Sequence, residues 1–525
     1  MSASPRPTTP ALKVAALQFL PTLYDKEGNT RRLLDLLSQA FSAGARIAVA
    51  PEMATTGYCF YDRADVSGLV ETLPGPTTGL VQAVCAVHDS VAVLGLPEVD
   101  AATGIYYNSI AVVGPQGLIG KYRKVHSFIA EPRWAMDGDL GHVVVQTPHG
   151  AIGLLDCADI ELFEGARVLQ ILGADLIAFP TNWCGGPAPS YYWWARAWEL
   201  GLPLIAADRI GTERGVAFSG GSTIFAADGT VLATRDDGEG IVLAEIEKGS
   251  PGTRKAPLPP RDCIPLARDT HRFNPEAFFN LYAHPSLPQG GELRVSALPL
   301  RGSLRGLVRN LRGVRDQVVV LPADALEGAW DAESTNEAVR VCRAQGIYLA
   351  FGSASTGDLA LVGPEGLLAL RRPQDRGTER AIVNLPGVRV GLCRGEELAW
   401  PETSRLFAME GVDLLLTPDR GLGFAPGRFA GSTVRSERGP APADDCYYFI
   451  PRVRAASDDL FVAYASAELP CAVFSAAKGR GEASLQGAEG IVDTRPTLRG
   501  LPDVRLKPHL RRRRPEHYRP LWTPQ

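Results

Sequence analysis

The 525-residue sequence has neither an excess of charge nor a long apolar run. Its formal net charge is −4, so no bulk basic field draws the chain to nucleic acid or anionic lipid. Every apolar stretch is shorter than the roughly 18 residues that a membrane-spanning helix needs. The polar, proline-containing start, residues 1–14, lacks the apolar core of a signal peptide. We therefore expect a cytoplasmic protein without nucleic-acid or membrane partners.

The nine cysteines include no CxxC pair, and their number is odd. Secreted disulfide frameworks use even sets of cysteines, and structural zinc sites use closely spaced pairs. The pattern argues against both kinds of site and favours a reducing environment. We expect neither a metal nor a cofactor.

Hydrophobic residues make up 45% of the chain and charged residues 21%, as is typical of globular proteins. The chain is too long for a single core. Short apolar, β-rich runs cover residues 14–19, 46–50, 91–95, 109–113, 152–155 and 175–179. Helical spacing of apolar residues lies between several of them, at 30–43, 163–172 and 191–200. Strands interleaved with helices predict a layered α/β fold.

The same order of short motifs recurs in the second half of the chain. Val295-Ser-Ala-Leu298 repeats the pattern of Val14-Ala-Ala-Leu17. Four more pairs follow in order: residues 318–322 with 47–51, 362–367 with 113–118, 402–405 with 164–167, and 515–518 with 275–278. Five ordered matches predict a tandem duplication. The turn-rich junction near residues 285–291 predicts domains at 10–285 and 286–525.

Three chemically reactive side chains stand just past predicted strands of the first half. Glu52 follows residues 47–51, Cys157 follows residues 152–155 after one aspartate, and Lys124 follows the strand and turn at 109–117. Ligands bind at the carboxyl ends of strands in open α/β sheets, so we expect these side chains to converge.

These residue types match the needs of amide chemistry. An amide carbon is a poor electrophile, so attack requires a strong nucleophile and a stabilised oxyanion. A free thiol has a pKa of ~8.5, so a neighbouring carboxylate can act as its base and later activate water. An ammonium group supplies positive charge for the thiolate and the oxyanion.

The motifs around these residues resemble the signature blocks of the nitrilase superfamily of carbon–nitrogen hydrolases. The blocks are Pro51-Glu52 before Thr56-Gly-Tyr58, then Gly120-Lys-Tyr-Arg-Lys-Val-His126, then a strand ending in Cys157 before Phe163-Glu164 and Arg167. Further similar elements are Pro180-Thr-Asn-Trp183, Arg196-Ala-Trp-Glu199 and Ser219-Gly-Gly-Ser222. The resemblance covers roughly residues 12–285.

The resemblance implies a role for each residue of the set. Cys157 becomes the nucleophile, Glu52 the general base and Lys124 the cationic stabiliser. Glu131 takes approximately the place of the family's second glutamate, which positions the lysine and the substrate. The backbone N–H of Ala158 becomes an oxyanion donor. The residues implied at the substrate are Tyr58, Ala158, Asn182 and Trp183.

Each of these residues also has an ordinary explanation when it is taken alone. A lone cysteine at a strand end is a small buried hydrophobe, and a lone lysine is a solvated charge. His126 lies beside the set, and we expect a structural role for it rather than a triad. We interpret Ser219–Ser222 as a glycine-rich turn, because no companion lysine motif accompanies it. We expect the basic run at 511–514 to pair with acidic surface.

The resemblance further implies two αββα four-layer sandwiches in tandem, which form an intramolecular pseudo-dimer and can oligomerise further. Aligning the motifs places Ala323 opposite Glu52, Pro373 opposite Lys124, and Gly395 opposite Cys157. The second copy thus lacks base, cation and nucleophile. We expect it to be a pseudo-hydrolase.

The leading hypothesis is a thiol amidase that cleaves a small amide and releases ammonia or an amine. Nitrilases of the family usually place Trp-Glu after the cysteine, whereas Ala158-Asp159 follows here and favours amides over nitriles. Carbamoyl hydrolases usually carry arginine shortly after it, where this chain has Ile160-Glu161. Acyl transfer to an amine and a catalytically idle scaffold remain alternatives. A catalytic Cys157 with a lowered pKa is expected to react with iodoacetamide faster than the other eight cysteines.

Overall fold

The computed structural model describes residues 11–249, 256, 258–270, 288–311, 314, 316–375, 380–421, 426–429, 444–475, 483–495, 505 and 507–523. They form two compact units, which are described separately. The first contains residues 11–249 and the C-terminal residues 514–523, and the second contains the described residues of 258–429 and 444–513. The predicted domain boundary at 285 and the motif at 275–278 lie outside the described residues.

Two six-stranded sheets form the centre of the first unit. One has the order β14 (Gly240–Ile246), β1 (Leu12–Gln18), β2 (Ile47–Val49), β3 (Val91–Val99), β4 (Tyr106–Gly114), β5 (Gly117–Arg123). The other has the order β13 (Val231–Arg235), β12 (Ser222–Phe225), β9 (Leu204–Asp208), β8 (Leu176–Thr181), β7 (Gly150–Leu154), β6 (Val144–Thr147). In each sheet the three central strands, β1–β2–β3 and β7–β8–β9, run parallel.

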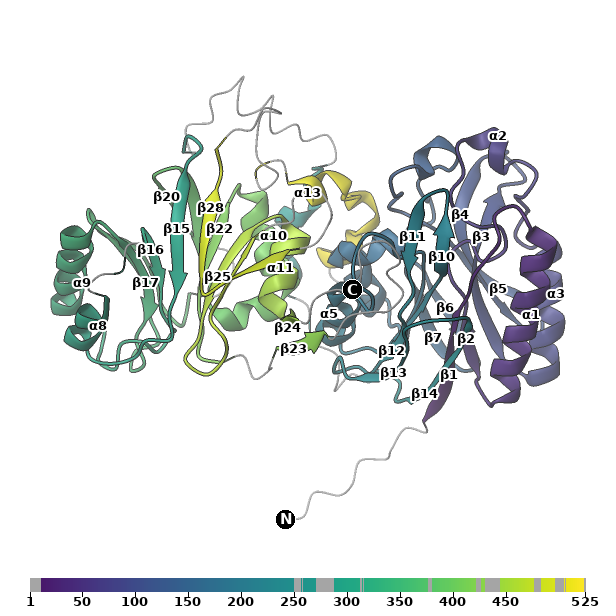
Figure 1. The fold of residues 1–525 in the computed structure, drawn as a ribbon, viewed down its shortest axis with the longest axis horizontal. Helices are drawn as coiled ribbons and strands as arrows, with labels where there is room; N and C mark the ends of the chain where they lie inside the picture. Colours follow the sequence, from purple (N-terminus) through teal and green to yellow (C-terminus); the bar gives the residue numbers. More distant parts are fainter. Residues whose placement is uncertain are drawn as a thin grey trace, which may run out of the picture. The chain divides into compact units, whose positions relative to one another are not determined.

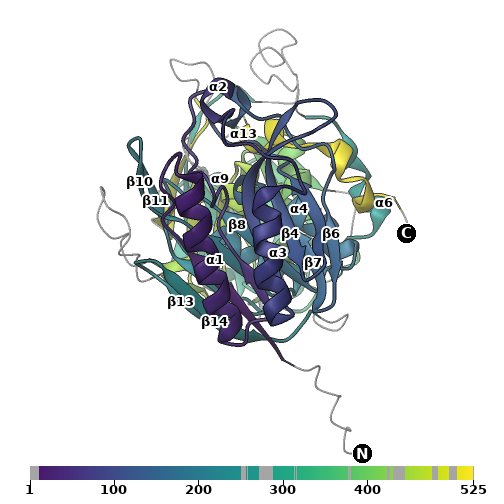
Figure 2. The same ribbon diagram turned by 90° about the vertical axis from the view of Figure 1, so that its right-hand side faces the viewer.

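Successive side chains of a strand point to opposite faces of its sheet, and this alternation produces the layers. Val14 and Ala16 of β1 join a buried cluster with residues of the second sheet, such as Ile152, so the two sheets pack face to face. Ala15 and Leu17 point the other way, into a cluster with Leu33 and Leu37. Helices α1 (Lys26–Ser42) and α3 (Pro76–His88) cover that outer face (Figure 2). Helices α4 (Phe163–Ile171) and α5 (Tyr191–Leu200) pack on the second sheet. The first unit is therefore an αββα sandwich.

The second unit repeats this strand order. One sheet has the order β28 (Glu489–Asp493), β15 (Glu292–Ala297), β16 (Val318–Val320), β17 (Tyr348–Gly352), β18 (Leu359–Gly363), β19 (Gly366–Arg371). The other has the order β27 (Ser484–Gly487), β26 (Ala472–Ser475), β25 (Phe461–Ala465), β22 (Leu414–Pro418), β21 (Val388–Leu392), β20 (Ala381–Leu385). Its helices include α8 (Leu304–Leu311), α9 (Ala332–Gln345), α10 (Pro401–Met409) and α11 (Ile450–Asp458) (Figure 1). This correspondence, strand for strand, is what a duplication predicts.

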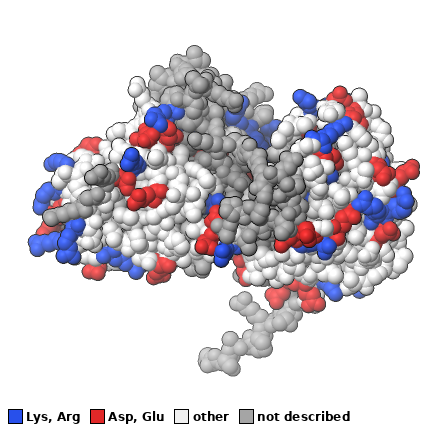
Figure 3. Space-filling view, viewed as in Figure 1, with Lys and Arg blue, Asp and Glu red and all other residues white. Residues whose placement is uncertain are grey.

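The expected alternation of strands and helices is confirmed. Each apolar run of the first half lies in or beside a strand, and the helical stretch at 191–200 has the same bounds as α5. Within the described residues, no helix combines the length and the apolar composition needed to cross a membrane. Basic and acidic side chains are interspersed on the described surface that Figure 3 shows.

Candidate active site

The first unit brings three of the predicted residues into direct contact. Glu52 follows β2, Lys124 follows β5, and Glu131 begins η1 (Glu131–Arg133). The ammonium Nζ of Lys124 lies 2.7 Å from Oε1 of Glu52 and 2.6 Å from Oε1 of Glu131. All three side chains are buried, with relative exposures of at most 2%. A buried ammonium between two carboxylates is costly to assemble and is typical of a functional site.

Cys157 begins the short helix η2 (Cys157–Glu161), directly past the end of β7. Its backbone φ is +43°, a left-handed conformation that a residue with a Cβ rarely adopts. Such strain persists only where the surrounding structure enforces it, and it gathers at active sites. The thiol is buried close enough to Glu52 and Lys124 for both charges to act on its pKa.

The pKa of the Cys157 thiol is shifted in the direction opposite to the expected one. Burial raises it well above the ordinary value, and the negative charge of Glu52 adds to the rise. Lys124 and the hydroxyl of Thr181 act in the opposite direction without cancelling the effect. The expected lowered pKa is wrong, because a sequence does not reveal how deeply a thiol is buried. The resting thiol is protonated, so it needs a base when substrate arrives.

The pKa values of Lys124 and Glu131 show how the charges are distributed. Burial disfavours the ammonium of Lys124, but Glu131 and Glu52 outweigh this and hold its pKa well above the ordinary value. Burial raises the pKa of Glu131 to about 7, with a further rise from Glu52, while Lys124 opposes both. Lys124 is therefore charged at neutral pH, and Glu131 is close to half-protonated.

Known proteins are similar to the first half of this chain. A sequence model of the carbon-nitrogen hydrolase family matches residues 13–254. A nitrilase from Pyrococcus abyssi is 37% identical over 238 residues, which cover 45% of this chain and 90% of the relative. This chain belongs to the carbon-nitrogen hydrolase family. An (R)-stereoselective amidase from a Pseudomonas species is 30% identical over 243 residues, 45% of this chain and 86% of the relative. The crystal structure of an amidase from Nesterenkonia sp. covers 45% of this chain and 90% of its own, at 22% identity and a TM-score of 0.40.

Asn108 is a residue of this carbon-nitrogen hydrolase site that the sequence reasoning missed. Its side-chain amide on β4 donates a hydrogen bond of 2.7 Å to Oε1 of Glu52. The backbone carbonyl of Asn108 accepts from the N–H of Lys124 at 2.9 Å. Asn108 thus orients both groups. The available signal was a polar residue at the start of the apolar run 109–113.

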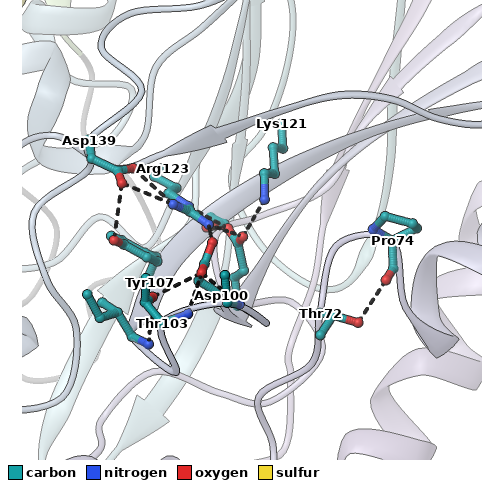
Figure 4. Close-up of polar contacts among 12 residues, drawn as sticks. Thr72, Pro74, Asp100, Thr103, Tyr107, Lys121, Arg123 and Asp139 are labelled. Atoms are coloured by element: carbon teal, nitrogen blue, oxygen red, sulfur yellow. Dashed lines mark hydrogen bonds and ion pairs between the residues drawn. The ribbon is translucent and has the colours of Figure 1, made fainter.

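Arg123 fixes the end of β5 immediately before Lys124 (Figure 4). One guanidinium nitrogen lies 2.6 Å from Glu98 and 2.7 Å from Asp100, and the other lies 3.0 Å from Asp139. Lys121 reaches the same Glu98 carboxylate at 2.5 Å. Since Arg123 is held by three carboxylates, the backbone that carries Lys124 has little freedom.

The residues predicted to contact substrate lie at the same edge of the sheets in this hydrolase. Tyr58 donates a hydrogen bond of 2.6 Å to Oε1 of Glu131, so it supports that carboxylate. Asn182 and Trp183 follow β8 and are buried, yet the Asn182 amide and the Trp183 indole N–H have no partner among the described residues. Ala158 is the second residue of η2, where backbone N–H groups have no acceptor within the helix.

Oε2 of Glu52 and Oε2 of Glu131 are also buried without a partner among the residues that the structure describes. Buried polar atoms without partners are rare in folded proteins. Their gathering around Lys124 is the property expected of a surface that receives a polar substrate. In the described part of the chain, no group of three or more histidine, cysteine or carboxylate side chains is placed to hold a metal.

Asp159, two residues after Cys157 in η2, holds a buried histidine. Oδ1 of Asp159 lies 2.6 Å from Nδ1 of His126, and Nε2 of His126 lies 2.6 Å from the Tyr518 hydroxyl. Tyr122 donates to the other oxygen of Asp159 at 2.7 Å. His126 therefore has the structural surroundings expected of it. Neither Asp159 nor Tyr518 was a candidate, although the motif that ends in Tyr518 is one of the repeated motifs.

Two further expectations concern surface and turn residues. Ser219–Ser222 links β11 (Val216–Ser219) to β12, and both of its glycines have positive φ, so the predicted glycine-rich turn is confirmed. Within the basic run, Arg514 lies 2.5 Å from Asp137. Burial raises the pKa of Cys59 and of Cys184 to about 12, so both thiols are protonated at neutral pH.

Proposed function

We propose that the first unit is a thiol amidase that hydrolyses the C–N bond of a small amide through an acyl-enzyme on Cys157. One observation carries the proposal: the Lys124 ammonium is held between Glu52 and Glu131 at the strand ends where Cys157 begins η2. This arrangement supports the proposal, because a base, a fixed positive charge and a nucleophile could then act on one carbonyl group.

The proposed reaction proceeds in two halves. Glu52 takes the proton of the Cys157 thiol as sulfur attacks the carbonyl carbon, and Lys124 with the Ala158 N–H stabilises the oxyanion. The C–N bond then breaks, and the proton on Glu52 passes to the departing nitrogen. In the second half Glu52 takes a proton from water, the hydroxide attacks the thioester, and the carboxylic acid leaves as the thiol is restored.

The finer choice of substrate rests on the residues after the nucleophile. The relatives bear the names nitrilase and amidase, so names alone support a carbon–nitrogen hydrolase that acts on amides or nitriles. Ala158-Asp159, in place of the Trp-Glu usual in nitrilases, favours the amide. Hydrolysis of a nitrile, hydrolysis of a carbamoyl compound, amide-forming acyl transfer and a scaffold role are the competing hypotheses.

The test is a panel assay of the full chain for ammonia release from amides, nitriles and carbamoyl compounds. The Cys157→Ala variant is expected to lose at least three orders of magnitude in kcat, because no remaining group forms the acyl-enzyme. Cys59→Ala is the matched control, because Cys59 is a half-buried cysteine of the same unit that the proposed reaction does not use. A Cys157→Ala enzyme with more than about a tenth of the wild-type rate contradicts the proposal.

We also propose that the second unit is a degenerate duplicate of the first and that the two form a pseudo-dimer in the cytoplasm. The repeated strand order supports the duplication. A fragment ending near residue 285 is the direct test of the pseudo-dimer, and we expect it to aggregate or self-associate. Such a fragment also lacks residues 514–523, which belong to the first unit.

A further inference from the structure

The second unit contains a cavity of about 250 Å³ at the carboxyl ends of its central strands. Its lining includes Ala323, Pro373, Arg394, Gly395, Asp419 and Arg420. A volume slightly below the usual range of ligand pockets suits a metabolite of a few heavy atoms. Nothing in the proposed chemistry of the first unit uses this cavity.

The cavity occupies the place that the candidate catalytic site has in the first unit. Ala323 follows Pro322 past the end of β16, as Glu52 follows Pro51 past the end of β2. In both units the carbonyl of that proline accepts a hydrogen bond from a glycine of the neighbouring strand, at 3.1 and 3.2 Å. The backbone of the site is therefore preserved where its base is absent.

The position in the second unit that corresponds to Cys157 has no room for a side chain. Gly395 begins η4 (Gly395–Ala399) as Cys157 begins η2, and in each case a nine-residue helix follows. A Cβ added at Gly395 would lie 2.2 Å from Oδ1 of Asp419 and 2.3 Å from its Cβ, so no side chain fits there. The cavity can bind a ligand but has no nucleophile to attack it.

Two arginines give this cavity a different chemistry. Arg394 donates to the backbone carbonyls of Gly357 at 2.7 Å and Arg371 at 3.1 Å. Arg420 donates to the carbonyls of Ser353 and Ala354 at 3.0 and 3.1 Å. Backbone carbonyls fix a guanidinium without neutralising its charge.

Neither guanidinium forms an ion pair with a carboxylate of the described residues. Burial lowers the pKa of Arg394, the negative charges of Glu397 and Glu396 oppose this, and the positive charges of Arg371 and Arg420 add to it. Neither guanidinium is neutralised by an ion pair within the described part of the chain, although Arg394 is half-buried and Arg420 is exposed. Guanidiniums of this kind recognise planar oxyanions by paired hydrogen bonds.

The acidic residues of the lining do not cancel this charge. Asp419 is buried, and its carboxylate accepts from the Tyr464 hydroxyl and from the N–H of Gly421. Burial raises its pKa, and these hydrogen bonds are to Tyr464 and Gly421 and not to either guanidinium. Glu396 is exposed, so water screens its charge.

We propose that the second unit binds a small carboxylate in this cavity, with Arg394 and Arg420 as the recognising groups and no covalent step. The site is a former catalytic pocket turned into a binding pocket. The proposed binding does not depend on the amidase proposal, since both recognising arginines belong to the second unit.

The test is isothermal titration of the full chain with acetate, butyrate and succinate, and with inorganic phosphate as a separate arm. Binding of at least one carboxylate is expected, with an affinity at least tenfold weaker in Arg420→Gln and partly recovered in Arg420→Lys. Arg420 is exposed, so its replacement is not expected to unfold the unit. Arg340→Gln is the matched control, because Arg340 is an exposed arginine of the same unit outside the cavity.

Three results would overturn the proposal. One is the absence of binding by any of the carboxylates. Another is unchanged affinity in both Arg420→Gln and Arg394→Gln, which would place the bound anion elsewhere. The third is binding of phosphate in preference to every carboxylate, which would assign the cavity to a different ligand class.

Discussion

The hydroxyl of Tyr518 lies 2.6 Å from Nε2 of His126, although 392 residues separate the two in the sequence. The other ring nitrogen of His126 contacts Asp159, two residues after Cys157. All of these residues belong to the first unit, so the C-terminal segment supports the backbone that carries the proposed nucleophile. The strained φ of Cys157 needs such support.

Removing this hydroxyl is expected to affect both stability and rate. Tyr518→Phe should cost about 1–2 kcal/mol in the free energy of unfolding, because His126 loses a buried hydrogen-bond partner. It should also lower kcat more than it raises KM, since Tyr518 positions the backbone at Cys157 through His126 and Asp159 and does not touch substrate. Thermal unfolding and steady-state kinetics measure the two effects. Tyr61→Phe is the control, because the Tyr61 side chain is 62% exposed. Equal behaviour of the two variants would contradict the positioning role.

Glu52→Gln should block both halves of the reaction. The amide keeps the size of the side chain but cannot take a proton from the thiol or from water. Intact-protein mass spectrometry of the variant with substrate is expected to show little turnover. Glu239→Gln, a change at a partly exposed glutamate, is expected to leave the rate unchanged. Normal product release by Glu52→Gln would show that another base, such as Glu131, does this work.

The pKa of Glu131, about 7, predicts an acid limb in the pH profile. Protonation of Glu131 removes the negative charge that holds the Lys124 ammonium at the oxygen where Lys124 and Tyr58 meet. Since protonation occurs as the pH falls, kcat/KM should drop about tenfold per unit below pH 7. Glu131→Gln should be slow at every pH and lack this limb. A wild-type profile that is flat from pH 5.5 to 7.5 would refute the assignment.

The sequence contained enough to predict that the candidate catalytic residues lie together, but not what surrounds them. Glu52, Lys124 and Cys157 each follow a strand within a local motif, so short-range patterns and the order of the motifs indicate them. Asn108 and Tyr518 act through contacts that only the folded chain creates. The direction of the Cys157 pKa depends on burial, which no motif encodes.

In the second unit, too, the sequence predicts local features but not the contacts that folding creates. Motif alignment predicts the absence of chemistry at Ala323, Pro373 and Gly395, because each position lies in a repeated pattern. It does not predict that Arg394 and Arg420 line one cavity, since they follow different strands. Their relation depends on β21 and β22 lying side by side in the sheet.

The last prediction concerns Gly395→Cys, made in the Cys157→Ala chain so that any activity comes from the second unit. A thiol at this position is expected to give no ammonia release, because Ala323 offers no base and Pro373 no cation. The variant should also lose about 1–3 kcal/mol of stability, since its Cβ meets Asp419 at less than contact distance.

The matched variant is Gly395→Cys with Asp419→Gly. The second change removes both the Cβ and the carboxylate oxygen of Asp419, which a side chain at Gly395 would meet at 2.3 and 2.2 Å. The double change should recover part of the lost stability, which thermal unfolding measures, and remain without activity. Ammonia release by either variant would mean that the second unit keeps a base or a cation that these residues do not provide. Failure of the double variant to recover stability would instead show that Asp419 is not what excludes a side chain at Gly395.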